Sequence, residues 1–198
     1  MKILELCAGY GGLGMAVTPL VGGHVAYVAE SAPGPSAVLA ERYPDAPNLG
    51  DIREIDWSRL VGKVDVITAG FPCQDISNAG PRVGITGERS GVWRNVVEAV
   101  RHIRPRYVFL ENVAVITRRG LDVVLGDLAE IGYDARWTCL RASDIGAPHQ
   151  RERWFAVAVP HSEGFGRPER QPEPDELQGA ARRASVHGDP PASDPYGP

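Results

Sequence analysis

Short runs of β-branched and aromatic residues alternate with helix-compatible segments along the first 160 residues of this 198-residue chain. We expect strands at 2–7, 24–30, 64–69, 106–110, 133–140 and 154–159, and helices at 13–20, 35–43, 92–103 and 121–131. This alternation predicts an α/β fold with a mostly parallel sheet covered by helices on both faces. Ligands bind at the carboxyl ends of the strands in such sheets, so the functional candidates are the segments that follow strands, 8–12, 30–31, 70–89 and 111–113.

The composition indicates the expected cellular location of the protein and the use of its cysteines. Hydrophobic residues make up 43% of the chain, but no apolar run approaches the length of a membrane span, and the first residues lack the pattern of a signal peptide. The three cysteines, Cys7, Cys73 and Cys139, are an odd number without the spacing of metal ligands. We therefore expect a cytoplasmic protein without membrane or metal, in which a special cysteine would act chemically.

The charge is unevenly distributed, although the net charge is only −4. Eight arginines face three glutamates between Arg82 and Arg119, a pattern that suits phosphate contacts but equally a solvated helix surface. From His161 to Pro198 there are seven prolines, five glycines and few aromatic residues, too little apolar surface to offset ordering entropy. We expect a catalytic, cofactor-binding domain at 1–160 and a disordered tail at 161–198.

A glycine-rich turn lies between the first strand and the first helix, with the sequence Leu6-Cys7-Ala8-Gly9-Tyr10-Gly11-Gly12. Glycines let the backbone approach a ligand closely, and the following helix start presents free N–H groups. Glu30 ends the second strand and is placed to accept from a ribose diol, while Asp51 could accept from an adenine amino group. The alternative is a tight turn that binds nothing.

Cys73 lies in a second motif, Gly70-Phe71-Pro72-Cys73-Gln74-Asp75-Ile76-Ser77, at the end of a strand. Most single cysteines are small buried hydrophobes. This one stands between a proline and a polar, glycine-bearing segment, which favours a loop position. The connection at 74–90 is long for a compact domain and predicts a lid or a disordered loop.

Two further motifs carry charged side chains near strand ends. Glu111-Asn112-Val113 offers a carboxylate, and Gly146-Ala147-Pro148-His149-Gln150-Arg151-Glu152-Arg153 offers two arginines that alternation places on one face of the last strand. Each of these motifs, taken alone, is more typical of a protein surface than of a site.

Taken together and in this order, the motifs resemble those of the cytosine-C5 DNA methyltransferase family over residues 1–159. The resemblance implies a Rossmann-like fold that uses S-adenosylmethionine, with double-stranded DNA as the partner. It implies a nucleophile at Cys73 that adds to the cytosine, a base-contacting acid at Glu111, and an arginine pair at Arg151 and Arg153. The cofactor pocket would be lined by Ala8, Gly9, Gly11, Gly12, Glu30, Asp51, Ile52, Pro72 and Val92. Further loop or nucleic-acid positions would be Gln74, Ser77 and Asn112.

The chain departs from the family pattern in two places. His149 stands where the family usually has the glutamine of a Gln-X-Arg-X-Arg string. Nothing after Pro160 resembles a target-recognition region or the Gly-Asn motif that completes the cofactor pocket. Three explanations stay open: a truncated gene, a split enzyme completed by a second polypeptide that supplies the target-recognition region, or a degenerate product. Methylation of transfer RNA and an inactive binding remnant remain alternatives. A nicotinamide-dependent dehydrogenase is disfavoured because the turn lacks the Gly-X-Gly-X-X-Gly fingerprint.

Overall fold

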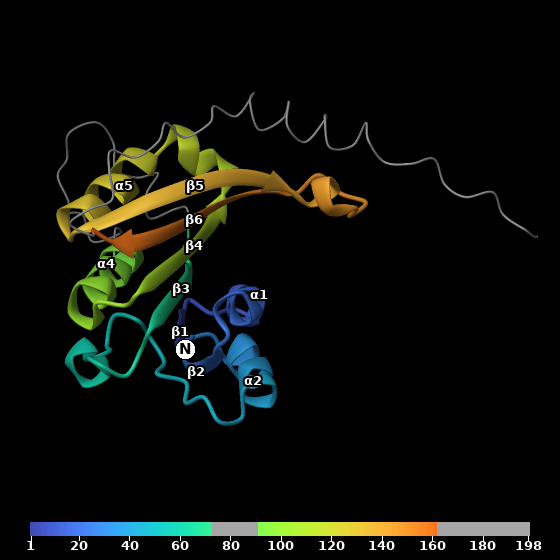
Figure 1. The fold of residues 1–198 in the computed structure, drawn as a ribbon. Helices are drawn as coiled ribbons and strands as arrows, with labels where there is room; N and C mark the ends of the chain where they lie inside the picture. The colour runs from blue at the N-terminus through green and yellow to red at the C-terminus, as the bar shows by residue number, and fades with distance from the viewer. Residues whose placement is uncertain (73–90, 162–198) are drawn as a thin grey trace, which may run out of the picture. The chain divides into compact units, whose positions relative to one another are not determined.

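The computed structural model describes residues 1–72 and 91–161, which contain one six-stranded sheet in the order β2-β1-β3-β4-β6-β5 (Figure 1). The strands are β1 (Lys2–Leu6), β2 (His24–Ala29), β3 (Val66–Gly70), β4 (Tyr107–Val113), β5 (Tyr133–Arg141) and β6 (Glu152–Pro160). The helices are α1 (Gly12–Val21), α2 (Pro33–Arg42), α4 (Gly91–Ile103) and α5 (Leu121–Glu130), with short 3-10 turns η1 (Trp57–Leu60), η2 (Ala114–Arg118) and η3 (Ala142–Ile145). The expected strands and helices are all present, with ends that differ by a few residues.

The direction of the strands places the candidate residues at one edge. β1 pairs in parallel with β2 and β3, and β3 pairs in parallel with β4. β6 runs antiparallel to both of its neighbours, β4 and β5. The carboxyl ends of β1, β2, β3 and β4 therefore meet at the same edge, as a mostly parallel sheet requires.

Helices cover both faces of the sheet because successive side chains of a strand point to opposite faces, and nearly all side chains of the central strands β1 and β3 are buried. On one face Ile3 and Val66 pack with Val17 of α1 and Leu39 of α2. On the other face the larger core cluster joins alternate strand residues to α4 and α5, including Leu4, Leu6, Ile67, Val96, Val100, Val124 and Leu128. Figure 1 shows the two pairs of helices on opposite sides of the strands.

One expectation about the site's local structure is wrong. The strand expected at 106–110 continues to Val113, so Glu111, Asn112 and Val113 lie within β4 rather than in a loop after it. The reason is tertiary, because Glu111 and Asn112 pair with Phe155 and Trp154 of β6, which extends the ladder. A strand position fixes the side-chain directions, and Glu111 and Asn112 point to opposite faces.

Several expectations fall outside the described residues. Cys73, Gln74, Ser77 and the segment expected to form a lid lie in 73–90, and the expected tail lies almost wholly in 162–198. Within the described ranges, no helix is long and apolar enough to cross a membrane.

Candidate active site

The turn between β1 and α1 uses backbone conformations that glycine favours. Gly9 and Gly11 have φ angles of 52° and 81°, in the left-handed region. Cys7, with φ of 50°, enters that region without being a glycine. The Gly11 N–H donates to the Ala8 carbonyl at 2.8 Å, which closes the turn just before α1 begins. The expected glycine turn is therefore present at the carboxyl end of β1.

A buried carboxyl group lies beneath this turn. Glu5 is only 2% exposed, and its Oε1 accepts the N–H of Gly14 in the first turn of α1 at 2.8 Å. Burial raises the pKa of Glu5 to about 7, against the opposing effect of backbone hydrogen bonds from Gly14 and Leu13. The sequence predicts Glu5 only as a residue of the first strand. Its position just before the glycine turn is the signal that could have made it a candidate site residue.

Glu30 follows β2 and links two loops. Its Oε2 accepts the Gly9 N–H at 2.8 Å, and its Oε1 accepts the Ala32 N–H at 2.8 Å. The backbone of Glu30 is held in turn by Asn48, whose side chain both accepts from the Glu30 N–H and donates to its carbonyl. Each carboxylate oxygen can accept more than one hydrogen bond, so this fixed carboxylate keeps acceptor capacity for a ribose.

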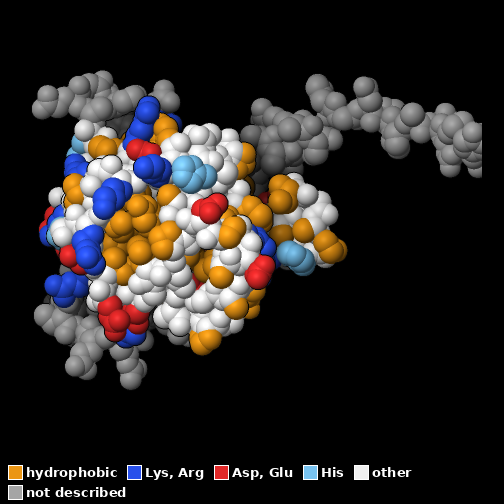
Figure 2. Space-filling view, turned by 90° about the horizontal axis from the view of Figure 1, so that it is seen from below, with side chains coloured by type: hydrophobic (Ala, Val, Ile, Leu, Met, Phe, Trp, Pro, Cys, Tyr) orange, Lys and Arg blue, Asp and Glu red, His pale blue; other side chains and the backbone are white. Residues whose placement is uncertain are grey.

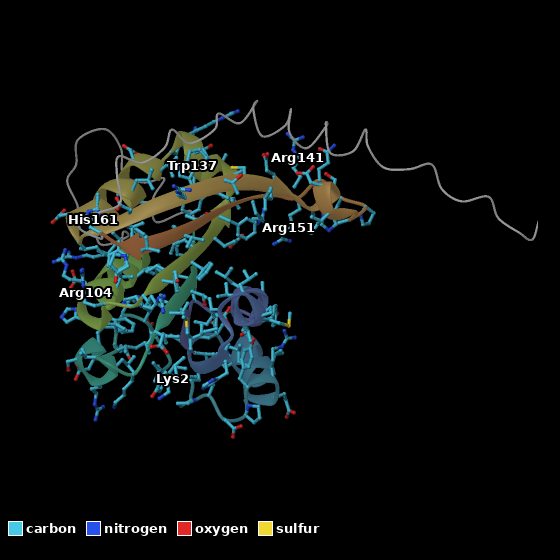
Figure 3. All side chains as sticks on the ribbon, viewed as in Figure 1. Lys2, Arg104, Trp137, Arg141, Arg151 and His161 are labelled. Atoms are coloured by element: carbon cyan, nitrogen blue, oxygen red, sulfur yellow. The ribbon has the colours of Figure 1, made fainter. Side chains whose placement is uncertain are left out.

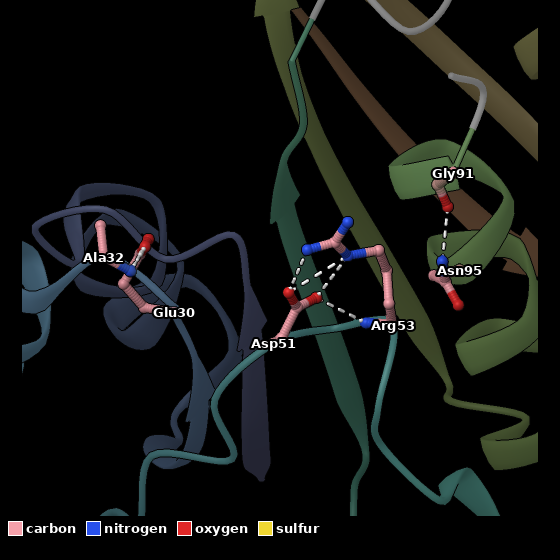
Figure 4. A network of polar contacts seen from close by, with 6 residues as sticks. All are labelled: Glu30, Ala32, Asp51, Arg53, Gly91 and Asn95. Atoms are coloured by element: carbon pink, nitrogen blue, oxygen red, sulfur yellow. Dashed lines mark hydrogen bonds and ion pairs between the residues drawn. The ribbon is translucent and has the colours of Figure 1, made fainter. Parts of the chain in front are cut away.

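Asp51 is held by a neighbour that sequence reasoning missed. Arg53 donates from Nε to Oδ1 and Oδ2 of Asp51, at 2.9 and 3.1 Å, and its backbone N–H donates to Oδ1 at 2.9 Å. The hydrogen bonds from the Arg53 side chain hold the pKa of Asp51 down at about 2. In the view of Figure 4 this pair appears between Glu30 and the start of α4 at Gly91. Asp51 is therefore a permanently ionised acceptor at neutral pH.

The remaining expected cofactor residues differ in exposure. The side chains of Ala8 and Ile52 are buried, at 7% and 6% exposure, and belong to the core on the two faces of the sheet. Pro72 is exposed after β3, Val92 is half-buried in the first turn of α4, and Gly12 is the first residue of α1. Ala8 and Pro72 follow strands, and Gly12 and Val92 lie at helix starts, whereas Ile52 lies in the irregular segment between α2 and η1.

Glu111 and Arg153 form an ion pair beside the segment that leads to Cys73. Arg153 Nε lies 2.9 Å from Glu111 Oε1, and both side chains keep partial exposure. Glu111 pairs in register with Gly70 of β3. A Cβ atom built on Gly70 would lie 3.3 Å from Glu111 Oε2, so the carboxylate rests against this glycine. The structure thus brings together two residues that are 42 positions apart in the chain, from Glu111 to Arg153.

Asn112 anchors the same segment from the opposite face. Its side chain is 3% exposed, and its Nδ2 donates to the Phe71 carbonyl at 2.9 Å. The Phe71 ring packs against Trp93 of α4 with ring centroids 4.8 Å apart, and Trp93 Nε1 donates to Asp127 of α5 at 2.7 Å. These contacts fix the backbone two residues before Cys73. Trp93 and Asp127 were missed because their pairing joins two separate helices.

The two arginines of the last motif occupy different positions. Arg153 lies within β6 and meets Glu111, whereas Arg151 comes just before β6 and is exposed. Figure 3 shows Arg151 and Arg141 at the base of the projecting β5–β6 hairpin end. Hydrophobic side chains stand exposed at this end in Figure 2, and Ile145 of η3 is 87% exposed. Only Arg153 therefore contacts the acid at 111.

Comparison with protein families and curated sequences gives matches over most of the chain. The model of the C-5 cytosine-specific DNA methylase family matches residues 1–183. Type II methyltransferase M.CviJI of a Paramecium bursaria Chlorella virus is 38% identical, over 80% of this chain and 43% of its own length. Type II methyltransferase M2.BsuMI of Bacillus subtilis is 32% identical, over 80% of this chain and 42% of its own length. The chain thus spans less than half the length of these two relatives.

Solved structures share the fold. A DNMT2 variant from Spodoptera frugiperda superposes with a TM-score of 0.67 at 21% identity, over 87% of this chain and 53% of that chain. The Dnmt2 methyltransferase of S. pombe gives a TM-score of 0.65 at 20% identity, over 83% of this chain and 52% of that chain. These likenesses identify a Rossmann-like methyltransferase fold.

Proposed function

Because the chain belongs to the C-5 cytosine-specific DNA methylase family, we propose that it carries the catalytic site for methyl transfer from S-adenosylmethionine to carbon 5 of cytosine in DNA. The observation that supports this most directly is the Glu111–Arg153 pair, which lies against Gly70 where the chain leads into Cys73. The glycine turn and Glu30 follow β1 and β2 at the same sheet edge.

The residues present suit the cofactor that this family uses. Glu30 offers a carboxylate fixed by two backbone N–H groups, which suits a ribose diol. Asp51 offers an ionised acceptor for an amino group, and the backbone of the turn at 8–12 offers a close approach. S-adenosylmethionine supplies an electrophilic methyl group on a sulfonium, and these residues would bind and orient it.

Cys73 is the proposed nucleophile, because carbon 5 of cytosine is too weakly nucleophilic to accept the methyl group directly. The Cys73 thiolate would add to carbon 6, and carbon 5 would take the methyl group from the sulfonium donor, which leaves as S-adenosylhomocysteine. A proton would then leave carbon 5, and the bond from carbon 6 to the Cys73 sulfur would break to regenerate the thiolate. An ordinary cysteine, with a pKa of about 8.5, is only slightly ionised at neutral pH, so nearby positive charge helps. Arg151 and Arg153 are the candidates to provide that charge.

Glu111 is the proposed contact for the pyrimidine edge of the base. A carboxyl group that bridges N3 and the exocyclic amine would stabilise the charge that develops as sulfur adds. Arg153 supports this role because it fixes one carboxyl oxygen and leaves the other against Gly70. The target base must leave the duplex to reach these groups, at a cost of a few kcal/mol.

We place the base-reading surface outside residues 1–198, either elsewhere in a longer chain or on a second polypeptide. The support is that the relatives extend well beyond the matched region, which covers 43% of M.CviJI and 42% of M2.BsuMI. Phosphate and sugar contacts position a protein on DNA, but contacts to base edges give sequence specificity. Double-stranded DNA is the proposed substrate, and the cytoplasm the proposed location.

The covalent step is tested with a duplex that contains 5-fluorocytosine, together with S-adenosylmethionine. We expect a stable adduct, because fluorine at carbon 5 cannot leave as a proton does, and we expect Cys73→Ala to abolish it. Cys139→Ala is the matched control, since that thiol lies on β5 and burial raises its pKa. An adduct that persists in Cys73→Ala contradicts the nucleophile assignment.

The assay is run on this chain alone and with a second polypeptide, the C-terminal part of the relative M2.BsuMI. Each is tested on duplex DNA and on transfer RNA. Adduct formation on DNA supports the proposal, and methylation of transfer RNA alone contradicts the proposed substrate. Binding of S-adenosylhomocysteine without any adduct, even after complementation, identifies an inactive binding remnant.

A further inference from the structure

Tyr43 directly follows α2, and its side chain reaches the glycine turn that precedes α1. Its hydroxyl group donates a hydrogen bond to the Gly11 carbonyl at 3.1 Å. The Gly11 carbonyl oxygen also accepts the N–H of Met15, in the first turn of α1, at 3.1 Å. Tyr43 therefore binds the carbonyl group at which α1 begins, although the two residues are 32 positions apart.

The Tyr43 ring also fills the space behind Gly11. A Cβ atom on Gly11 would lie 2.8 Å from Tyr43 Cε2, closer than real Cβ contacts, and 3.2 Å from Leu39 Cδ2, a tight contact. Gly11 has no side chain with which to cap α1, and its φ of 81° suits only a glycine without strain. The turn is thus held from the α2 side by contact with the ring and by the hydroxyl bond.

The backbone of Tyr43 is held on both sides. Its N–H donates to the Leu39 carbonyl of α2 at 2.8 Å, and its own carbonyl accepts from the N–H of Ala46, in the segment after α2, at 3.0 Å. Burial, and then the neighbouring Glu5 carboxyl, raise the pKa of Tyr43, so the hydroxyl keeps its proton and remains a donor at neutral pH.

We propose that Tyr43 is a positioning residue for cofactor binding, which acts through Gly11 by holding the turn at 8–12 in its binding conformation. This inference rests on the proposed function, because it takes the turn as part of the S-adenosylmethionine pocket. A turn that is held in place before the ligand arrives loses less conformational entropy on binding. Neither the glycine motif nor the family resemblance assigns Tyr43 a role.

The test is calorimetric binding of S-adenosylhomocysteine to the full chain and to Tyr43→Phe, which keeps the ring and removes the hydroxyl. We expect the dissociation constant to rise about 3- to 10-fold, the effect of one lost neutral hydrogen bond. Tyr107→Phe is the matched control, because Tyr107 begins β4 at the opposite edge of the sheet. Its affinity should equal that of the wild type.

Amide hydrogen exchange separates positioning from a general loss of stability. In the free Tyr43→Phe protein, we expect faster exchange in the turn at 8–12 and at Met15, with unchanged protection in α4 and α5. Unchanged affinity in Tyr43→Phe, or exchange that rises throughout the sheet, overturns the inference and leaves the proposed function intact. A wild-type chain that fails to bind S-adenosylhomocysteine even when the complementing polypeptide is added contradicts both.

Discussion

Glu5 holds a carboxyl group where water hardly reaches it. Its neighbour in the sheet register, Thr68 of β3, is also fully buried, and the Gly14 N–H of α1 lies directly above. A buried carboxyl resists ionisation, which is why its pKa rises from 4.5 to about 7. The ionisation state of the Glu5 carboxyl group, which contacts the start of α1, therefore changes near neutral pH.

The first prediction concerns the stability of the fold between pH 5 and pH 8. With a pKa of about 7 when folded and 4.5 when unfolded, Glu5 binds more protons in the folded state. Its contribution to the free energy of unfolding must therefore fall as pH rises through this window, by up to about 3 kcal/mol. Glu5→Gln, which cannot ionise, should remove this dependence.

Urea denaturation at several pH values measures the effect. The stability of Glu5→Gln relative to wild type should increase from pH 5 to pH 8, whereas Glu41→Gln, on the exposed surface of α2, should give a constant difference. Parallel pH profiles for wild type and Glu5→Gln would show that Glu5 does not ionise in this window.

The second prediction concerns Asn112. Asn112→Ala leaves the Phe71 carbonyl without its buried donor, so we expect a loss of about 1–3 kcal/mol in the free energy of unfolding. Asn95→Ala is the control, because the Asn95 side chain donates within α4, to the Gly91 carbonyl, and alanine favours helices. Equal losses in the two variants, measured by denaturant unfolding, would contradict a special role for Asn112.

At the scale of the elements, helix α1 packs closely against the sheet at Gly14. A Cβ atom on Gly14 would lie 2.2 Å from Glu5 Oε2 and 3.1 Å from Val25 Cγ2. The close approach lets the Gly14 N–H reach the Glu5 carboxyl. In α5, by contrast, a Cβ atom on Gly126 would meet nothing within 4 Å. The two helical glycines therefore have different reasons to be present.

The third prediction is that alanine has opposite effects at these two positions. Gly126→Ala should stabilise the protein by about 0.5–1 kcal/mol, because alanine restricts the unfolded chain and favours the helix. Gly14→Ala should destabilise it by about 1–3 kcal/mol, because the added methyl group overpacks the contact between α1 and Glu5. Thermal unfolding midpoints that move in the same direction would contradict this account of the α1 contact.

At the scale of the whole molecule, residues Met1–Gly164 form a compact unit. Both hydrophobic clusters are built from residues within it, and they bury the two faces of the same sheet. Tyr133 of β5 belongs to the larger cluster, and its hydroxyl donates to the Pro105 carbonyl at 2.7 Å. The larger hydrophobic cluster therefore joins the first strand of this unit, β1, to its last, β6.

The fourth prediction is that a chain ending at Gly164 folds as the full chain does. We expect the same thermal unfolding midpoint and the same affinity for S-adenosylhomocysteine, because the hydrophobic clusters and the proposed cofactor residues precede that point. Differential scanning calorimetry and titration of the two chains check this. A lower midpoint or weaker binding in the shorter chain would assign a stabilising role to residues 165–198.

The type and order of the elements could be predicted from the chain because they depend on local patterns. Apolar periodicity, glycines and prolines indicated the alternation of strands and helices, and parallel strands then required the glycine turn, Glu30 and Gly70 to share an edge. The motif around Glu111 predicts an acid there, but the pattern gave the wrong end for β4. That end depends on pairing with residues of β6 that lie 40 or more positions further along the chain.

Tertiary structure alone decided which side chains meet. Tyr43 reaches Gly11 across 32 positions, and Asn112 reaches Phe71 across 41. No local propensity encodes such pairs, since they arise only when helices pack on a sheet in a defined register. The raised pKa of Glu5 has the same origin, because a glutamate in a strand becomes a buried acid only when a helix covers it.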